Sequence, residues 1–221
     1  MIVTCLPQFQ IHDESGSQRG ISPILQWYTA PNNQREEMSL VDGVNLDPAI
    51  TGVIGRLRNV LDLRLTGTEL HDLTCFVLHK LLLLPPLRAT DANATAISEC
   101  LRYATALFML LLHGTTYYSH HELMASLQLQ LKAHLRQVTG TSHTYSAAGI
   151  WILSVGMTAS RDSLSGSVED SQWFADQAYV GKHAIGLQTW DDVLKCLEKV
   201  LWVKTWEQGA GLFRRGWDEV L

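Results

Sequence analysis

The chain has 221 residues, of which 46% are hydrophobic and 18% are charged. A chain of this size and composition can bury a substantial core, which excludes an intrinsically disordered protein. Its net charge is −5 with only 17 lysines and arginines, which is a poor basis for stand-alone DNA binding. The four cysteines lie far apart in the sequence, which indicates a reducing compartment, cytosol or nucleus.

Residues 1–46 are predicted to form an irregular N-terminal arm. Proline, glycine and asparagine interrupt this segment, and only Ser22–Tyr28 has the pattern of a short helix. Met1–Leu6 is too short an apolar stretch for a secretory signal.

Residues 47–221 are predicted to form one helical domain, because apolar residues recur there at intervals of three and four. Asp47 followed by Pro48 marks the first helix start. The next two helices are expected from Thr68-Glu69 to Pro85-Pro86, and from Thr90 or Asp91 to about Gly114. Between Ala104 and Leu112 only one residue is polar, so the third of these helices is predicted to be the buried, central one.

The second half of the chain is expected to contain four more helices and a short final one. The signals are a capping box at Ser119–Glu122, a helical pattern over Tyr145–Ser160, another over Ser171–Gly186, and a cap at Thr189. Gly209-Ala210-Gly211 is predicted to break the chain before a short final helix.

The predicted fold class is therefore all-α, an irregular multi-helix bundle with an irregular N-terminal arm. No strand-like alternation is found along the sequence. A membrane span needs about 20 apolar residues, and the longest apolar runs are much shorter, so no membrane association is expected.

The sequence offers no motif of catalysis. His120, His121 and Glu122 are adjacent, so on a helix they point in different directions and do not form a metal-binding pair. Five further histidines are interpreted as isolated imidazoles: His71, His79, His113, His134 and His143. No nucleophile elbow and no phosphate-binding glycine loop is present. We therefore predict no catalytic residue, no cofactor-binding residue and no metal ligand, and no enzymatic activity.

Six of the seven tryptophans lie at or beyond Trp151. They are interpreted first as core residues of the last helices. Two alternatives remain open, an exposed anchor for a protein partner and an aromatic pocket for a small effector. The candidate partner or effector contacts are Trp202, Trp206, Trp217, His113, Tyr117 and Tyr118.

The order of these C-terminal segments resembles a known family. The matching segments are Leu127–Lys132, Thr139-Gly140, Ile150–Gly156, Trp173-Phe174, Thr189–Val193, Val200–Trp202 and Trp217–Leu221. Over residues 123–221 they resemble the C-terminal part of the regulatory domain of fungal-specific transcription factors. That family carries a binuclear zinc-cluster DNA-binding module upstream of this domain. This chain has no Cys-x-x-Cys, so a zinc cluster is expected only in an upstream module absent from this chain.

The resemblance implies a regulatory or protein-interaction domain that acts in the nucleus. This domain is not expected to bind specific DNA sequences itself. Cytoplasmic location is the alternative. A second hypothesis is a helical small-molecule-binding protein or enzyme, with Arg102, His113, Tyr117 and Tyr118 lining a pocket beside the central helix. Neither hypothesis defines target genes, an effector, a partner or an oligomeric state.

Overall fold

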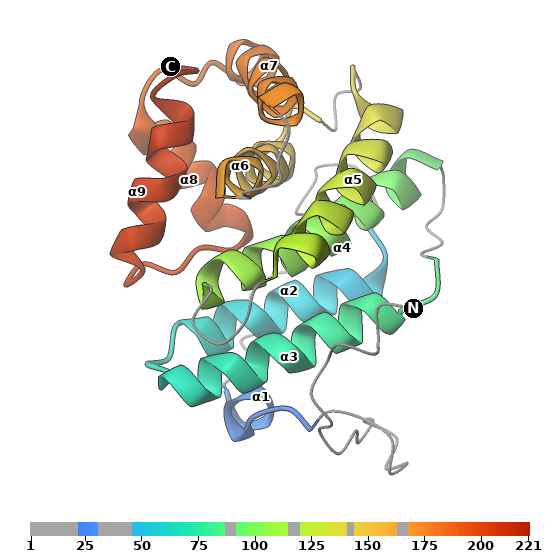
Figure 1. Cartoon of the computed structure of the whole chain (residues 1–221), viewed down its shortest axis with the longest axis vertical. Helices are drawn as coiled ribbons and strands as arrows, with labels where there is room; N and C mark the ends of the chain where they lie inside the picture. Colours follow the sequence, from blue (N-terminus) through green and yellow to red (C-terminus); the bar gives the residue numbers. More distant parts are fainter. Residues whose placement is uncertain (1–21, 31–45, 87–91, 115–119, 141–143, 163–167) are drawn as a thin grey trace.

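A computed structural model describes residues 22–30, 46–86, 92–114, 120–140, 144–162 and 168–221. Nine helices and no strand occur in these segments, which confirms the predicted all-α fold (Figure 1). The first five helices are α1 (Leu25–Thr29), α2 (Pro48–Leu61), α3 (Gly67–Leu83), α4 (Ala92–His113) and α5 (His121–Val138). The other four are α6 (Ala147–Asp162), α7 (Val168–Ile185), α8 (Trp190–Val200) and α9 (Glu207–Trp217).

Helix α4 lies at the centre of the bundle, as its apolar sequence predicts. It contacts α2, α3, α5 and α6, and nearly all of its side chains from Ala94 onward are buried. It is also long and apolar enough to cross a membrane. However, 83% of its most apolar window is buried inside the bundle, as in the core helix of a globular protein. Among the described residues it is the one helix with this length and composition.

Helix α6 organises the C-terminal part of the chain, where it contacts α7, α8 and α9 (Figure 1). Its Trp151 is fully buried, and the indole N–H donates to the carbonyl of Leu201 at 2.7 Å. On the same helix Gly156 lies against Phe174 of α7, since a Cβ at Gly156 would be 2.4 Å from the ring. Helices α4 and α6 contact each other, and helices α1–α5 therefore share one continuous hydrophobic core with helices α6–α9.

The described part of the N-terminal arm contains α1, close to the short helix expected there. Trp27 of α1 is buried, and its ring meets Phe76 of α3 edge-on at a centroid distance of 5.0 Å. The rest of the arm, residues 1–21 and 31–45, lies outside the described residues.

Local hydrogen bonds explain the starts of α2, α3 and α8. The carboxylate of Asp47 accepts from the backbone N–H of Ala49 at 2.8 Å, which confirms the predicted cap of α2. Helix α3 begins one residue earlier than predicted, because Thr66 and Glu69 form a reciprocal capping box. Pro85-Pro86 follows the end of α3, as expected.

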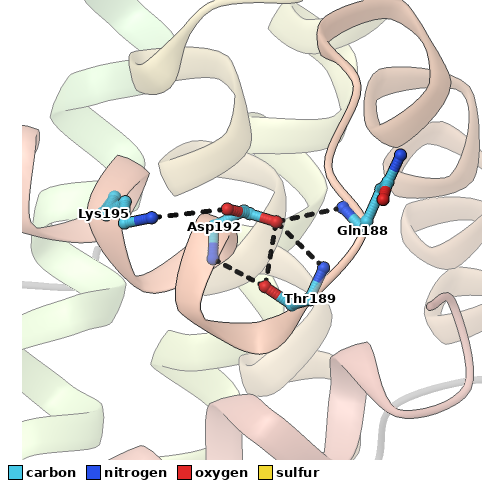
Figure 2. Close-up of polar contacts among 4 residues, drawn as sticks. All are labelled: Gln188, Thr189, Asp192 and Lys195. Carbon is cyan, nitrogen blue, oxygen red and sulfur yellow. Dashed lines mark hydrogen bonds and ion pairs between the residues drawn. The ribbon is translucent and has the colours of Figure 1, made fainter.

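The predicted cap of α8 is also confirmed (Figure 2). Thr189 Oγ1 accepts from the backbone N–H of Asp192, while the Asp192 carboxylate accepts from the backbone N–H of Thr189. The same carboxylate accepts from the backbone N–H of Gln188, and Lys195 lies 3.5 Å from its other oxygen. These bonds, that of the Thr189 side chain first, lower the pKa of Asp192.

The structure differs from the prediction at α9 and leaves the predicted cap of α5 untested. Helix α5 begins after His120, whose side chain makes no cap hydrogen bond. Ser119, on which the predicted capping box depends, lies outside the described residues. Gly209-Ala210-Gly211 does not break the chain but lies inside α9. Within α9, Gly209 lies under the indole of the N-cap residue Trp206, where a Cβ would be 2.0 Å from a ring atom, so the glycine makes room for this local contact.

Long basic side chains join separate elements. Arg58 of α2 donates to the carbonyls of Val200 at 2.7 Å and Glu198 at 3.0 Å, and also to that of Lys199. The last carbonyls of a helix have no partner within it, so Arg58 satisfies those at the end of α8. Lys182 of α7 donates to the carbonyls of Val220 and Leu221, which follow the end of α9.

Candidate functional site

Three histidines meet where α3, α4 and α5 come together. His71 lies in the first turns of α3, His113 ends α4, and His120 directly precedes α5. The His71 and His113 rings are 5.1 Å apart, and those of His113 and His120 are 5.6 Å apart, centroid to centroid. His113 and His120 are buried. Together with Cys75 these three residues form what we call the histidine cluster.

The connections between helices bring the cluster together. Helices α3 and α4 run antiparallel, because Arg102 of α4 contacts the end of α3 while His113 contacts its start. Cys75 is one turn after His71 and therefore on the same face of α3. The chain then returns from α4 into α5 within seven residues, which places His120 beside His113.

Hydrogen bonds within the cluster form one directed chain. His113 Nδ1 lies 2.9 Å from the carbonyl oxygen of Gly114, which can only accept, so this nitrogen carries the proton. His113 Nε2 is then an acceptor, and His71 Nδ1 donates to it at 3.0 Å. His71 Nε2 in turn accepts from the Cys75 thiol, whose sulfur is 3.7 Å away. The carbonyl of Gly114 thus fixes the tautomers of both neutral imidazoles.

His120 is held in its neutral form. Burial is the main cause that lowers its pKa to about 4, and the neighbouring His113, His71 and His121 lower it further. Since the ordinary value is 6.5, this imidazole is uncharged at neutral pH. Its position at the N-terminus of α5 also disfavours a positive charge, because the helix dipole is positive there.

The cluster does not have the geometry of a metal centre. In the described part of the chain, no group of three or more His, Cys, Asp or Glu side chains is placed to hold a metal ion. The facing nitrogens of His71 and His113 bond to each other, and their other nitrogens face the Cys75 thiol and the Gly114 carbonyl. What this arrangement can do is hold, release and redistribute protons.

The candidate contact residues of the sequence analysis fall in different places. Trp217 is fully buried, and its indole N–H donates to Ser154 Oγ at 2.9 Å, so this side chain belongs to the core. Trp202 and Trp206 are half-buried and have ring centroids 6.4 Å apart. Both also pack against Phe213 of α9. Tyr117 and Tyr118 lie outside the described residues.

Arg102 and His113 do not converge on one pocket. They are eleven residues apart on α4, which corresponds to about 16 Å along a helix axis. The Arg102 guanidinium is directed to the end of α3, where it donates to the carbonyl of Leu84 at 2.9 Å and forms an ion pair with Glu99 at 3.4 Å. Arg102 therefore serves to cap α3, while His113 belongs to the histidine cluster.

His71 and His113 are not the isolated imidazoles that their sequence context predicts but neighbours of each other, and the neighbouring Cys75 and His120 are not predicted from the sequence. The i, i+4 spacing of His71 and Cys75 was visible in the sequence. The pairing of His71 with His113 follows only when α3 and α4 are placed antiparallel with the correct register.

The fold and the cluster define an all-α helical bundle with a buried, hydrogen-bonded group of imidazoles. Comparisons with known protein families, with curated proteins and with solved structures found no match for this chain.

Proposed function

We propose that this chain is the regulatory, protein-interaction domain of a fungal transcription regulator and does not itself bind specific DNA sequences. The proposal begins from the resemblance of residues 123–221 to the regulatory domain of that family. It places the protein in the nucleus, where the domain would act through contacts with other proteins.

One observation supports the proposal most strongly. The residues that carry the resemblance contact one another around α6, although they are far apart in the sequence. Trp151 donates to the carbonyl of Leu201, and Trp217 donates to Ser154. Phe174 packs against Gly156. These segments are therefore a connected part of the core, which is compatible with the proposed family architecture.

Two partly exposed tryptophans near these segments support the proposed contact with a protein partner. Trp202 and Trp206 are the half-buried members of the C-terminal aromatic group, and tryptophan is enriched among residues that dominate protein interfaces. The net charge of −5 favours a protein partner over the phosphate backbone of DNA.

A reporter assay tests the regulatory role. The whole chain is fused to an unrelated DNA-binding module, and transcription from a promoter with that module's site is measured in fungal cells. We expect the fusion to change transcription several-fold relative to the module alone, and Trp202→Ala to reduce this change. Leu129→Ala is the matched control, because Leu129 is an exposed apolar residue on α5. A fusion as active as the bare module would contradict the proposal.

A gel-shift experiment tests the second half of the proposal. The purified chain is mixed with a pool of random duplexes at low and at physiological salt. We expect at most weak binding that disappears as salt is raised, because few cations are available to replace phosphate counterions. Tight, site-specific binding that resists salt would show that the chain recognises DNA directly.

A further inference from the structure

The hydrogen bonds of the histidine cluster are compatible with few protonation states. The chain from Cys75 through His71 and His113 to Gly114 uses both ring nitrogens of each of the two imidazoles. A doubly protonated His113 would direct its Nε2–H at the Nδ1–H of His71, across an N–N distance of 3.0 Å. One added proton can be held on His71, whose Nδ1–H still donates to His113 Nε2 while its Nε2–H faces the Cys75 sulfur. A proton on each ring, however, leaves two donors and no acceptor between His71 and His113.

We infer that the histidine cluster is a pH-sensitive latch, which holds α3, α4 and α5 together while its imidazoles are neutral and loosens this junction when it takes up protons. The three rings come from three different elements, so repulsion between imidazolium groups acts across the junction and not within one helix. This inference goes beyond the proposed function and does not depend on it.

The charges around the cluster favour such a response. Burial and three neighbouring imidazoles lower the pKa of His120. Among the described residues, no carboxylate contributes to this shift. The carboxylates on α3, α4 and α5 are Glu69, Asp72, Glu99 and Glu122, and Glu99 is paired with Arg102 far from the cluster on α4. Glu69 is engaged with Thr66 and Gln26. The connecting residues 115–119 contain no acidic side chain in the sequence.

The direction of the pH dependence follows from the lowered pKa of His120. Above the ordinary value of 6.5 neither the folded nor the unfolded chain binds this proton, and the full stability is present. Between pH 6.5 and about 4 the unfolded chain binds it and the folded chain does not, so stability falls as the pH falls. Below about pH 4 the folded chain binds the proton too, and the stability that neutral His120 contributes has been lost.

Urea unfolding of the whole chain at about pH 7 and about pH 4.5 tests the latch. The proton on His120 alone should raise the unfolding equilibrium constant roughly 50-fold between these conditions. His120→Gln, which cannot be protonated, should lack this increment. His183→Gln is the matched control, because His183 is exposed on α7 and outside the cluster, and it should keep the wild-type pH response. An equal pH response in His120→Gln and wild type would overturn the inference.

NMR of the histidine rings in the wild-type chain gives a test that needs no variant. We expect His120 to titrate with a midpoint near 4, and His71 and His113 to be Nδ1–H tautomers when neutral. The Nδ1–H form is the minor one for histidine in water, so two such rings would report the directed chain. A midpoint near 6.5 for His120, or an Nε2–H tautomer for neutral His113, would overturn the inference.

Discussion

At the scale of single residues, the close contact between Gly156 and Phe174 decides how α6 and α7 approach each other. A methyl group at position 156 would lie 2.4 to 2.9 Å from three ring carbons of Phe174, and that ring is itself fully buried. The ring cannot move away without disturbing the core around it, because interiors are close-packed. A small residue is therefore required at this position for a packing reason and not for its backbone freedom.

We expect Gly156→Ala to destabilise the protein by about 1–3 kcal/mol, because the cost of overpacking exceeds the gain in helix propensity. Gly52→Ala in α2 is the matched control. It places the same methyl group where no other atom lies within 4 Å, and should stabilise the protein by about 0.5–1 kcal/mol. Urea unfolding of both variants measures the difference. Equal effects of the two substitutions would show that the contact with Phe174 is unimportant.

Trp202 is expected to contribute less to stability than Trp217. Trp202 is half-buried, with its ring edge-on to Phe213 at 5.3 Å, whereas Trp217 is fully buried and hydrogen-bonded to Ser154. We expect Trp202→Ala to cost about 2 kcal/mol and Trp217→Ala about 3–5 kcal/mol in the free energy of unfolding. Thermal unfolding provides the measurement, and a larger loss for Trp202→Ala would contradict this order.

At the scale of elements, Arg58 is the side chain that joins α2 to α8. Its guanidinium donates to three consecutive carbonyls at the end of α8, which would otherwise lack partners. Arg58→Gln should cost about 1–2 kcal/mol in the free energy of unfolding, and Arg58→Lys somewhat less, since lysine keeps the charge but loses the planar group.

Arg56→Gln is the control for this prediction, because Arg56 lies on the same helix and is also partly buried, whereas the hydrogen bonds to the carbonyls of α8 come from Arg58. Hydrogen exchange of amides in α8 distinguishes the mechanism from a general loss of stability. Protection in α8 should decrease more than protection in α3 when Arg58 is replaced. A uniform decrease along the chain would show that Arg58 does not act on the end of α8.

The helices could be predicted from the sequence where local signals decide them. Asp47 with Pro48, and Thr189 with Asp192, form their caps within three residues, so no distant contact is needed. The prediction was wrong at Gly209–Gly211, because the glycines were interpreted as helix breakers, whereas Gly209 lies inside α9 and makes room for the Trp206 ring. The histidine cluster could not be predicted, since it depends on the register between α3 and α4.

At the scale of the whole molecule, helices α1–α5 and helices α6–α9 share one hydrophobic core and are not separate domains. Helix α4 packs against α2, α3 and α5 on one side and against α6 on another (Figure 1). Phe108 of α4 contacts Trp151, Trp206 and Phe213 from the C-terminal part of the chain. Neither group could unfold without exposing apolar surface of the other, which favours a single cooperative transition.

The distribution of tryptophans allows a direct test of this cooperativity. In Trp27→Phe all six remaining tryptophans lie in or after α6, so their fluorescence reports the C-terminal part, while far-UV circular dichroism reports every helix. We expect the urea midpoints from the two signals to coincide, and Arg58→Gln added to this variant to shift both midpoints equally. If the fluorescence midpoint separated from the circular dichroism midpoint, the helices around α6 would unfold on their own. In that case the contacts of Phe108 and Arg58 would be too weak to couple the two parts.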